Sequence, residues 1–178
     1  ELLTTLRPLG RRIRLRDGQR LLVRTLWMPL AAAALVLFAG RLEYEKGVQD
    51  AIAALPRIRR THPGTTLAIA GEGTQFAWLS ELTRTHRVSK SVTFLGNLDH
   101  VELLSWLHGA DAIVLPSRYE PFGIIALEAA AAGTPLVTST AGGLGEAVVD
   151  GETGLSFAPG DVVGLTSAVR EVLDDPAA

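Results

Sequence analysis

Two glutamates, Glu120 and Glu128, stand eight positions apart in a stretch whose residue types could recognise a sugar. Glu120 precedes the predicted start of a helix, and Glu128 lies inside that helix among isoleucine, leucine and alanine residues. A carboxylate packed into such a helix needs a partner, because desolvating a charge is costly. Carboxylate oxygens accept hydrogen bonds from vicinal hydroxyl groups. At this spacing Glu120 could accept hydrogen bonds from sugar hydroxyls, and Glu128, two turns further along, could accept two from a ribose diol.

The start of the same predicted helix adds backbone donors. The N–H groups of Phe122, Gly123 and Ile124 have no partner inside the helix, and the helix dipole places positive potential there. Phosphate oxygens or sugar hydroxyls suit this position, and a glycine allows close approach to the backbone. In an alternative interpretation, Glu120 only caps the helix electrostatically and Glu128 pairs with a nearby base.

A second glycine-containing loop is a further candidate. Gly71 and Gly73 follow a predicted strand and open a helix, so a nucleotide could pass close to the backbone there, although isolated glycine turns are common. Gly73 is followed by no third glycine at the dinucleotide-binding spacing. The segment from Gly40 to Gly47 likewise lacks the order of the phosphate-binding loop of ATPases. Neither loop predicts a nicotinamide or ATP site on its own.

Residues this far apart in sequence need a scaffold that gathers them. From position 35 onward, short apolar runs alternate with longer amphipathic segments, as in parallel strands buried under crossover helices. The predicted strands are 35–39, 67–70, 92–95, 112–115, 136–138 and 155–157. The predicted helices are 47–61, 74–87, 100–107, 123–132, 144–149 and 161–173.

This element order predicts an α/β fold with a Rossmann-like, doubly wound parallel sheet. Short connections and right-handed crossovers favour that topology, and such sheets bind ligands beyond the carboxyl ends of their strands. The segments that follow the predicted strands contain the candidate residues. These segments are 40–47, 71–74, 96–99, 116–123 and 139–145.

The stretch from Glu120 to Glu128, with Pro-Phe-Gly inside it, resembles the E-x7-E motif of retaining glycosyltransferases of the GT-B fold. The resemblance is to the large family called glycosyltransferase group 1. It implies that the sheet forms one half of a GT-B fold. It also implies that the Gly96-Asn97-Leu98 turn holds the nucleotide base, with Leu98 as the candidate residue.

The resemblance covers the chain from about position 37 to its end. Gly40 and Arg41, followed by Lys46 and Gly47, are similar to the phosphate-binding turn of that family. The resemblance implies that Arg41 and Lys46 neutralise a departing diphosphate, a role that suits a guanidinium fork and an ammonium. The alternative is a surface pair bridged to the neighbouring glutamates.

The implied reaction moves a hexose from a UDP-, ADP- or GDP-hexose donor to a hydroxyl acceptor with retention of configuration. Glu120 would orient the hexose, and a covalent intermediate is not required. The implied acceptor is an α-glucan, as in glycogen-synthase-like enzymes, or a glycolipid. The donor is a substrate, and no cofactor is implied. A GT-B epimerase and a nicotinamide-dependent oxidoreductase are the alternatives.

The resemblance also predicts the domain organisation. Residues 1–34 would be an irregular or truncated N-terminal segment, and residues 35–178 a C-terminal nucleotide-sugar-binding domain. A complete family member would have a preceding acceptor-binding domain of similar size, which is expected to be missing here. A donor-binding module without catalysis is therefore a further alternative.

The composition argues against several other classes of function and site. A net charge of −2 argues against a nucleic-acid partner, and the absence of cysteine excludes disulfides and thiolate chemistry. The four histidines are not closely paired and no Asp-x-Asp occurs, so no metal is predicted. The longest apolar run is too short to cross a bilayer. Because nothing in the composition needs an oxidising compartment and the arginines are scattered rather than placed ahead of an apolar core, as a signal peptide requires, a cytoplasmic protein is predicted. Residues 1–30 contain seven arginines, so peripheral membrane contact in the full-length enzyme stays open.

Overall fold

Six short apolar segments form one parallel sheet in the computed structural model, which describes residues 33–175. The strand order is β3-β2-β1-β4-β5-β6. The predicted strands are confirmed, with ends that differ by one residue at most. Their bounds are β1 (Leu35–Ala39), β2 (Thr66–Ala70), β3 (Val92–Gly96), β4 (Ala112–Leu115), β5 (Leu136–Ser139) and β6 (Leu155–Phe157).

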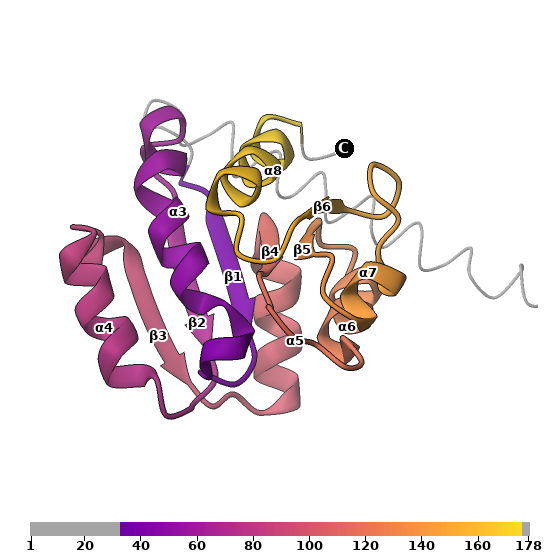
Figure 1. Ribbon diagram of the computed structural model, residues 1–178, viewed down its shortest axis with the longest axis horizontal. Helices are drawn as coiled ribbons and strands as arrows, with labels where there is room; N and C mark the ends of the chain where they lie inside the picture. Colours follow the sequence, from indigo (N-terminus) through magenta and orange to yellow (C-terminus); the bar gives the residue numbers. More distant parts are fainter. Residues whose placement is uncertain (1–32, 176–178) are drawn as a thin grey trace, which may run out of the picture. The chain divides into compact units, whose positions relative to one another are not determined.

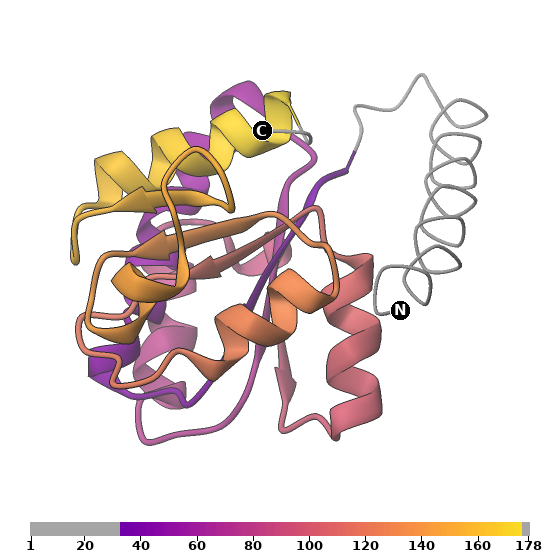
Figure 2. The same cartoon turned by 90° about the vertical axis from the view of Figure 1, so that its right-hand side faces the viewer.

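Helices cover both faces of the sheet, as Figures 1 and 2 show. One layer contains α3 (Val48–Thr61), α4 (Phe76–Thr85) and α8 (Val162–Asp174). The other contains α5 (His100–Gly109), α6 (Ile124–Ala131) and α7 (Gly143–Ala147). Two short 3-10 helices, η1 (Tyr44–Lys46) and η2 (Ser89–Ser91), were not predicted from the sequence. The α/β class and the Rossmann-like arrangement are confirmed.

The alternation of side chains in β1 explains why both faces need helices. Val36 and Phe38 are buried in the core beneath α3 and α8, whereas Leu37 and Ala39 are buried in the core beneath α5 and α6. A strand buried on both faces is apolar at every position, which is why the strands read as continuous apolar runs in the sequence. The same burial fixes where the strands end and the polar loops begin.

The path of the chain creates a switch point between two neighbouring strands. From β1 the chain winds outward through β2 to β3, and it then returns to place β4 on the other side of β1. The loops that follow β1 and β4 therefore leave the sheet toward opposite helical layers. A crevice opens between them at the carboxyl ends of the strands, which is where open α/β sheets bind ligands.

Most of the predicted N-terminal segment lies outside the described residues, including all of its arginines. The predicted boundary at position 34/35 thus stays a prediction. Among residues 33–175, no helix combines the length and apolar character that crossing a bilayer requires.

Candidate functional site

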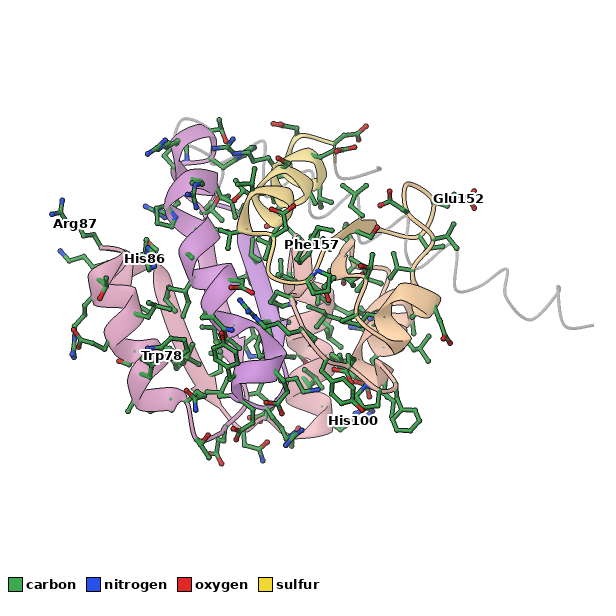
Figure 3. All side chains as sticks on the ribbon, viewed as in Figure 1. Trp78, His86, Arg87, His100, Glu152 and Phe157 are labelled. Carbon is green, nitrogen blue, oxygen red and sulfur yellow. The ribbon has the colours of Figure 1, made fainter. Side chains whose placement is uncertain are left out.

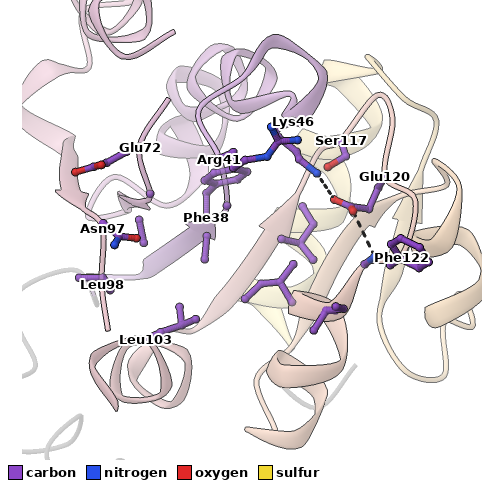
Figure 4. Close-up of a pocket in the computed structure, with 18 residues that line it drawn as sticks. Phe38, Arg41, Lys46, Glu72, Asn97, Leu98, Leu103, Ser117, Glu120 and Phe122 are labelled. Atoms are coloured by element: carbon purple, nitrogen blue, oxygen red, sulfur yellow. Dashed lines mark hydrogen bonds and ion pairs between the residues drawn. The ribbon is translucent and has the colours of Figure 1, made fainter. Parts of the chain in front are cut away.

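A cavity of about 510 Å³ occupies the crevice at the switch point. Its walls come from the loops after β1, β2, β3 and β4 and from the start of α6 (Figure 4). The cavity brings together nine of the eleven residues that the sequence singled out. These are Gly40, Arg41, Lys46, Gly71, Leu98, Glu120, Phe122, Gly123 and Ile124.

An ion pair joins the two loops that flank the crevice. The Lys46 Nζ atom donates to the Glu120 Oε2 atom at 2.7 Å, across 74 positions of sequence (Figure 4). The two side chains are only 13% and 15% exposed. An ammonium has three donors, so one bond to Glu120 leaves two for a ligand in the cavity. Lys46 therefore lies beside the carboxylate of the E-x7-E motif and not in a bridge to an adjacent glutamate.

The carboxylate of Glu120 also faces the start of α6. Its Oε1 atom accepts a hydrogen bond from the Gly123 N–H at 3.4 Å. Burial would raise the pKa of Glu120, but the hydrogen bond and charge of Lys46, with the backbone donors of Gly123 and Phe122, outweigh burial and hold the pKa below its ordinary value. Glu120 thus remains ionised and caps the helix while one side of it faces the cavity.

The lowered pKa of Glu120 predicts a pH-dependent contribution to stability. A carboxyl group whose pKa is depressed by folding stabilises the protein above its unfolded pKa, and this contribution is lost as the pH falls through the folded pKa. We expect Glu120→Gln to lower the free energy of unfolding by about 1 kcal/mol at pH 7. The difference from the parent should shrink below the ordinary glutamate value of 4.5. Urea unfolding at several pH values measures it, and a difference independent of pH would contradict the assignment.

Arg41 lies at the rim of the cavity with a mostly exposed side chain. Its guanidinium is 3.5 Å from the Glu45 carboxylate, and the Arg41 side chain is 70% exposed. The surface pair that the sequence left open is therefore present for Arg41. An exposed pair of this kind contributes little free energy, so the guanidinium can exchange Glu45 for a more highly charged anion.

Two predicted residues, Glu128 and Gly73, do not line this cavity. Glu128 is half-buried in α6, four positions after Ile124, and residues four apart share a helix face. Within residues 33–175 the Glu128 carboxylate has no hydrogen-bond or ion-pair partner, so the alternative of a paired base is not observed. Gly73 lines an adjacent cavity that also contains Phe76 and Phe94, whose rings meet edge to face.

Sequence reasoning missed three polar residues of the cavity wall. Glu72, Asn97 and Ser117 line it from the loops after β2, β3 and β4. Figure 4 shows Glu72 and Asn97 on the side of the cavity opposite Lys46 and Glu120. Each of the three lies in a segment that the sequence placed after a strand, and this position was the available signal. Their residue types are too common in loops to stand out without the fold.

The histidines form no metal site with acidic residues in the part of the chain that the structure describes. Figure 3 shows His86 and His100 far apart, at the end of α4 and the start of α5. No group of three or more histidine, cysteine, aspartate or glutamate side chains among residues 33–175 is placed to hold a metal ion. The polar groups that line the candidate site are backbone amides, the carboxylates of Glu72 and Glu120, the side chains of Asn97 and Ser117, and the cations of Arg41 and Lys46.

A family model and a curated relative each match most of this chain. The model of the family described as glycosyl transferases group 1 matches residues 31–178. A glycogen synthase from Mycobacterium tuberculosis is 70% identical over 150 residues, which cover 84% of this chain and 36% of that protein.

Solved structures show the same fold. A sucrose-phosphate synthase from Thermosynechococcus elongatus has a TM-score of 0.73 and 36% identity, over 86% of this chain and 39% of its own. The HepE protein of Anabaena, in complex with UDP-glucose, has a TM-score of 0.76 and 27% identity, over 82% of this chain and 40% of its own. The chain spans about a third of the length of the curated relatives that it matches.

Proposed function

We propose, since this chain belongs to the family of group 1 glycosyl transferases, that it forms the nucleotide-sugar-binding part of a retaining hexosyltransferase. The observation that carries the proposal is the ion pair between Lys46 and Glu120 at the switch-point cavity. A cation for a diphosphate and a carboxylate for sugar hydroxyls are placed side by side there. A nucleotide sugar has those two chemistries next to each other.

Lys46 and Arg41 would stabilise the departing nucleoside diphosphate. When the bond between the sugar and the diphosphate breaks, negative charge grows on the phosphate oxygens, and cations already in place lower the free energy of that state. Lys46 is held at the cavity by Glu120, and Arg41 stands at the rim with a weakly paired guanidinium. A preorganised Lys46 and a mobile Arg41 would bind the two ends of the diphosphate.

The hexose and ribose would be held by the E-x7-E segment. Glu120 would accept hydrogen bonds from hexose hydroxyls, and the Ile124 amide would add a donor at the start of α6. The amides of Phe122 and Gly123 would add further donors when the ligand replaces their contacts with Glu120. Glu128 would accept from the ribose diol, because its carboxylate lies on the face of α6 that Ile124 shares and has no partner of its own among residues 33–175. Leu98 would contact the base.

The donor we propose is a UDP-, ADP- or GDP-hexose that acts as a substrate, without a further cofactor. The HepE structure is a complex with UDP-glucose, and the relative at 70% identity is called a glycogen synthase. These two comparisons support a glucosyl donor and an α-glucan acceptor. A glycolipid is the second acceptor class, because a mannosyltransferase that acts on phosphatidylinositol monomannoside is 36% identical over 148 residues.

Because the chain spans about a third of these relatives, donor binding and catalysis need separate tests. Titration calorimetry of the chain with UDP-glucose, ADP-glucose, GDP-mannose and NAD tests the first. We expect one or more sugar nucleotides to bind and NAD to bind more weakly or not at all. Preferential binding of NAD would contradict the proposal. Release of nucleoside diphosphate in the presence of glycogen then distinguishes a transferase from a donor-binding module.

The ribose assignment of Glu128 predicts a specific loss. Glu128→Gln keeps the shape of the side chain but removes its charge and replaces one acceptor oxygen with a donor, so nucleotide-sugar affinity should fall by about 10-fold. Calorimetry with the preferred donor measures the change. Glu146→Gln, on α7, is the control, because Glu146 is exposed and does not line the cavity. Equal affinities for the parent and a folded Glu128→Gln chain would remove Glu128 from the site.

A further inference from the structure

A third ion pair, between Arg118 and Asp50, lies outside the cavity wall. The Arg118 Nη2 atom donates to both carboxylate oxygens of Asp50, at 2.9 and 3.0 Å. Asp50 is 5% exposed, in the first turn of α3, and Arg118 lies in the loop after β4. Neither residue lines the cavity. A carboxylate that is nearly fully buried is stable only with such a partner, so this pair is fixed in place.

Further contacts extend the pair to η1. The Arg118 guanidinium lies over the Tyr44 ring, 5.1 Å from its centroid, and the Tyr44 hydroxyl accepts from its Nη1 atom at 3.4 Å. The backbone N–H groups of Arg118 and Tyr119 both donate to the Glu45 carbonyl, at 2.7 and 3.3 Å. Arg118 thus binds the loop after β1 through both its side chain and its backbone.

The loop after β1 and the loop after β4 also meet without space between them. Gly47 has a φ of +70°, and a Cβ atom there would come within 1.8 Å of the Pro116 carbonyl oxygen. Gly47 directly follows Lys46, and Arg118 precedes Glu120 by two residues. The contacts of Arg118 therefore lie beside the two residues that form the ion pair at the cavity.

We propose that Arg118 and Asp50 are positioning residues, whose ion pair fixes the separation of Lys46 and Glu120 by clamping the loop after β4 to the start of α3, which follows Lys46 and Gly47 directly. The expected effect on donor binding rests on the proposed function. The effect of the clamp on the Lys46–Glu120 pair does not depend on that function. Neither residue touches the proposed ligand, so both act through Lys46 and Glu120.

The first test needs no ligand. Arg118→Lys keeps the charge but loses the planar group over the Tyr44 ring and the Nη1 atom that donates to the Tyr44 hydroxyl, so the clamp should loosen and the Lys46–Glu120 pair with it. NMR titration of the Glu120 carboxyl should then show its pKa moving up toward its ordinary value. Asp50→Asn should move it in the same direction. Val172→Ala, a buried change in α8 outside both loops, is the control for lost stability. If the pKa of Glu120 stays at the parent value in both Arg118→Lys and Asp50→Asn, the proposal is overturned.

The second test measures ligands on the same variants. In Arg118→Lys the dissociation constants of UDP, ADP or GDP should rise by about 10-fold, whereas that of the matching nucleoside should not change. In a Lys46→Met background the effect of Arg118→Lys should disappear, because the residue through which it acts is gone. Equal losses for nucleoside and diphosphate, or additive losses, would assign Arg118 to stability alone. If the parent binds no nucleotide, the proposed function fails and the Glu120 titration still decides the clamp.

Discussion

A chain with Lys46→Met is expected to lose about 100-fold in affinity for the nucleoside diphosphate, or about 3 kcal/mol of binding free energy. Methionine keeps most of the apolar stem but removes the ammonium that donates to Glu120 at 2.7 Å. Two effects then add. The ligand loses a charge-assisted hydrogen bond, and the Glu120 carboxylate, only 15% exposed, is left to repel the diphosphate without compensation.

Calorimetry with the preferred nucleoside diphosphate measures the Lys46→Met loss. The chain has one other lysine, Lys90 in η2, which is exposed and does not line the cavity, so Lys90→Met is a matched control. Adding Glu120→Gln to Lys46→Met should restore part of the affinity, because it removes the repulsion. Unchanged affinity in a folded Lys46→Met chain would show that Lys46 does not contact the diphosphate.

A Gly71→Ala chain is expected to be less stable by about 3 kcal/mol and to lose the cavity. Gly71 has a φ of +129°, which a residue with a side chain rarely adopts, and a Cβ atom would lie 1.9 Å from the Gly40 carbonyl oxygen. Because the neighbour is backbone at the end of β1, the strain can be relieved only by separating the loops after β1 and β2. Both loops line the cavity.

Urea unfolding measures the loss of stability in Gly71→Ala. Gly109→Ala is the control, since Gly109 ends α5, has no left-handed backbone and has nothing within 4 Å of the position of an added Cβ. That control should leave stability unchanged or raise it slightly, because alanine favours a helix over glycine. Equal unfolding midpoints for the two variants would contradict the account of the Gly71 contact.

The scaffold was predictable from sequence because burial on both faces leaves a simple pattern. The run from Leu35 to Ala39 is apolar at every position, and the polar loop after it begins where the sheet ends. Once such runs are taken as parallel strands, the topology alone gathers Gly40, Gly71, Leu98 and Gly123 at one edge. Nine of the eleven predicted site residues line the cavity for this reason.

Pairing between distant charges could not be predicted in the same way. Lys46 and Glu120 are 74 positions apart, and Arg118 and Asp50 are 68 apart. No local period records which cation meets which carboxylate, because that choice depends on how two loops pack in three dimensions. The close approach of Gly71 to the Gly40 carbonyl was likewise not predictable from the sequence, because it joins two loops that are separate in the chain. The approach of a nucleotide to Gly71 stays a prediction.

Amide chemical-shift mapping of the chain with its preferred nucleotide sugar tests the central claim most directly. If the switch-point cavity is the donor site, the largest changes should fall on Gly40, Lys46, Leu98 and Gly123, which lie in the loops after β1, β3 and β4. The amides of residues 80–85 in α4 and 168–174 in α8, in the second halves of these helices and outside the cavity wall, should change little. Largest changes outside the cavity, or none at saturating UDP-glucose, ADP-glucose and GDP-mannose, would contradict the account.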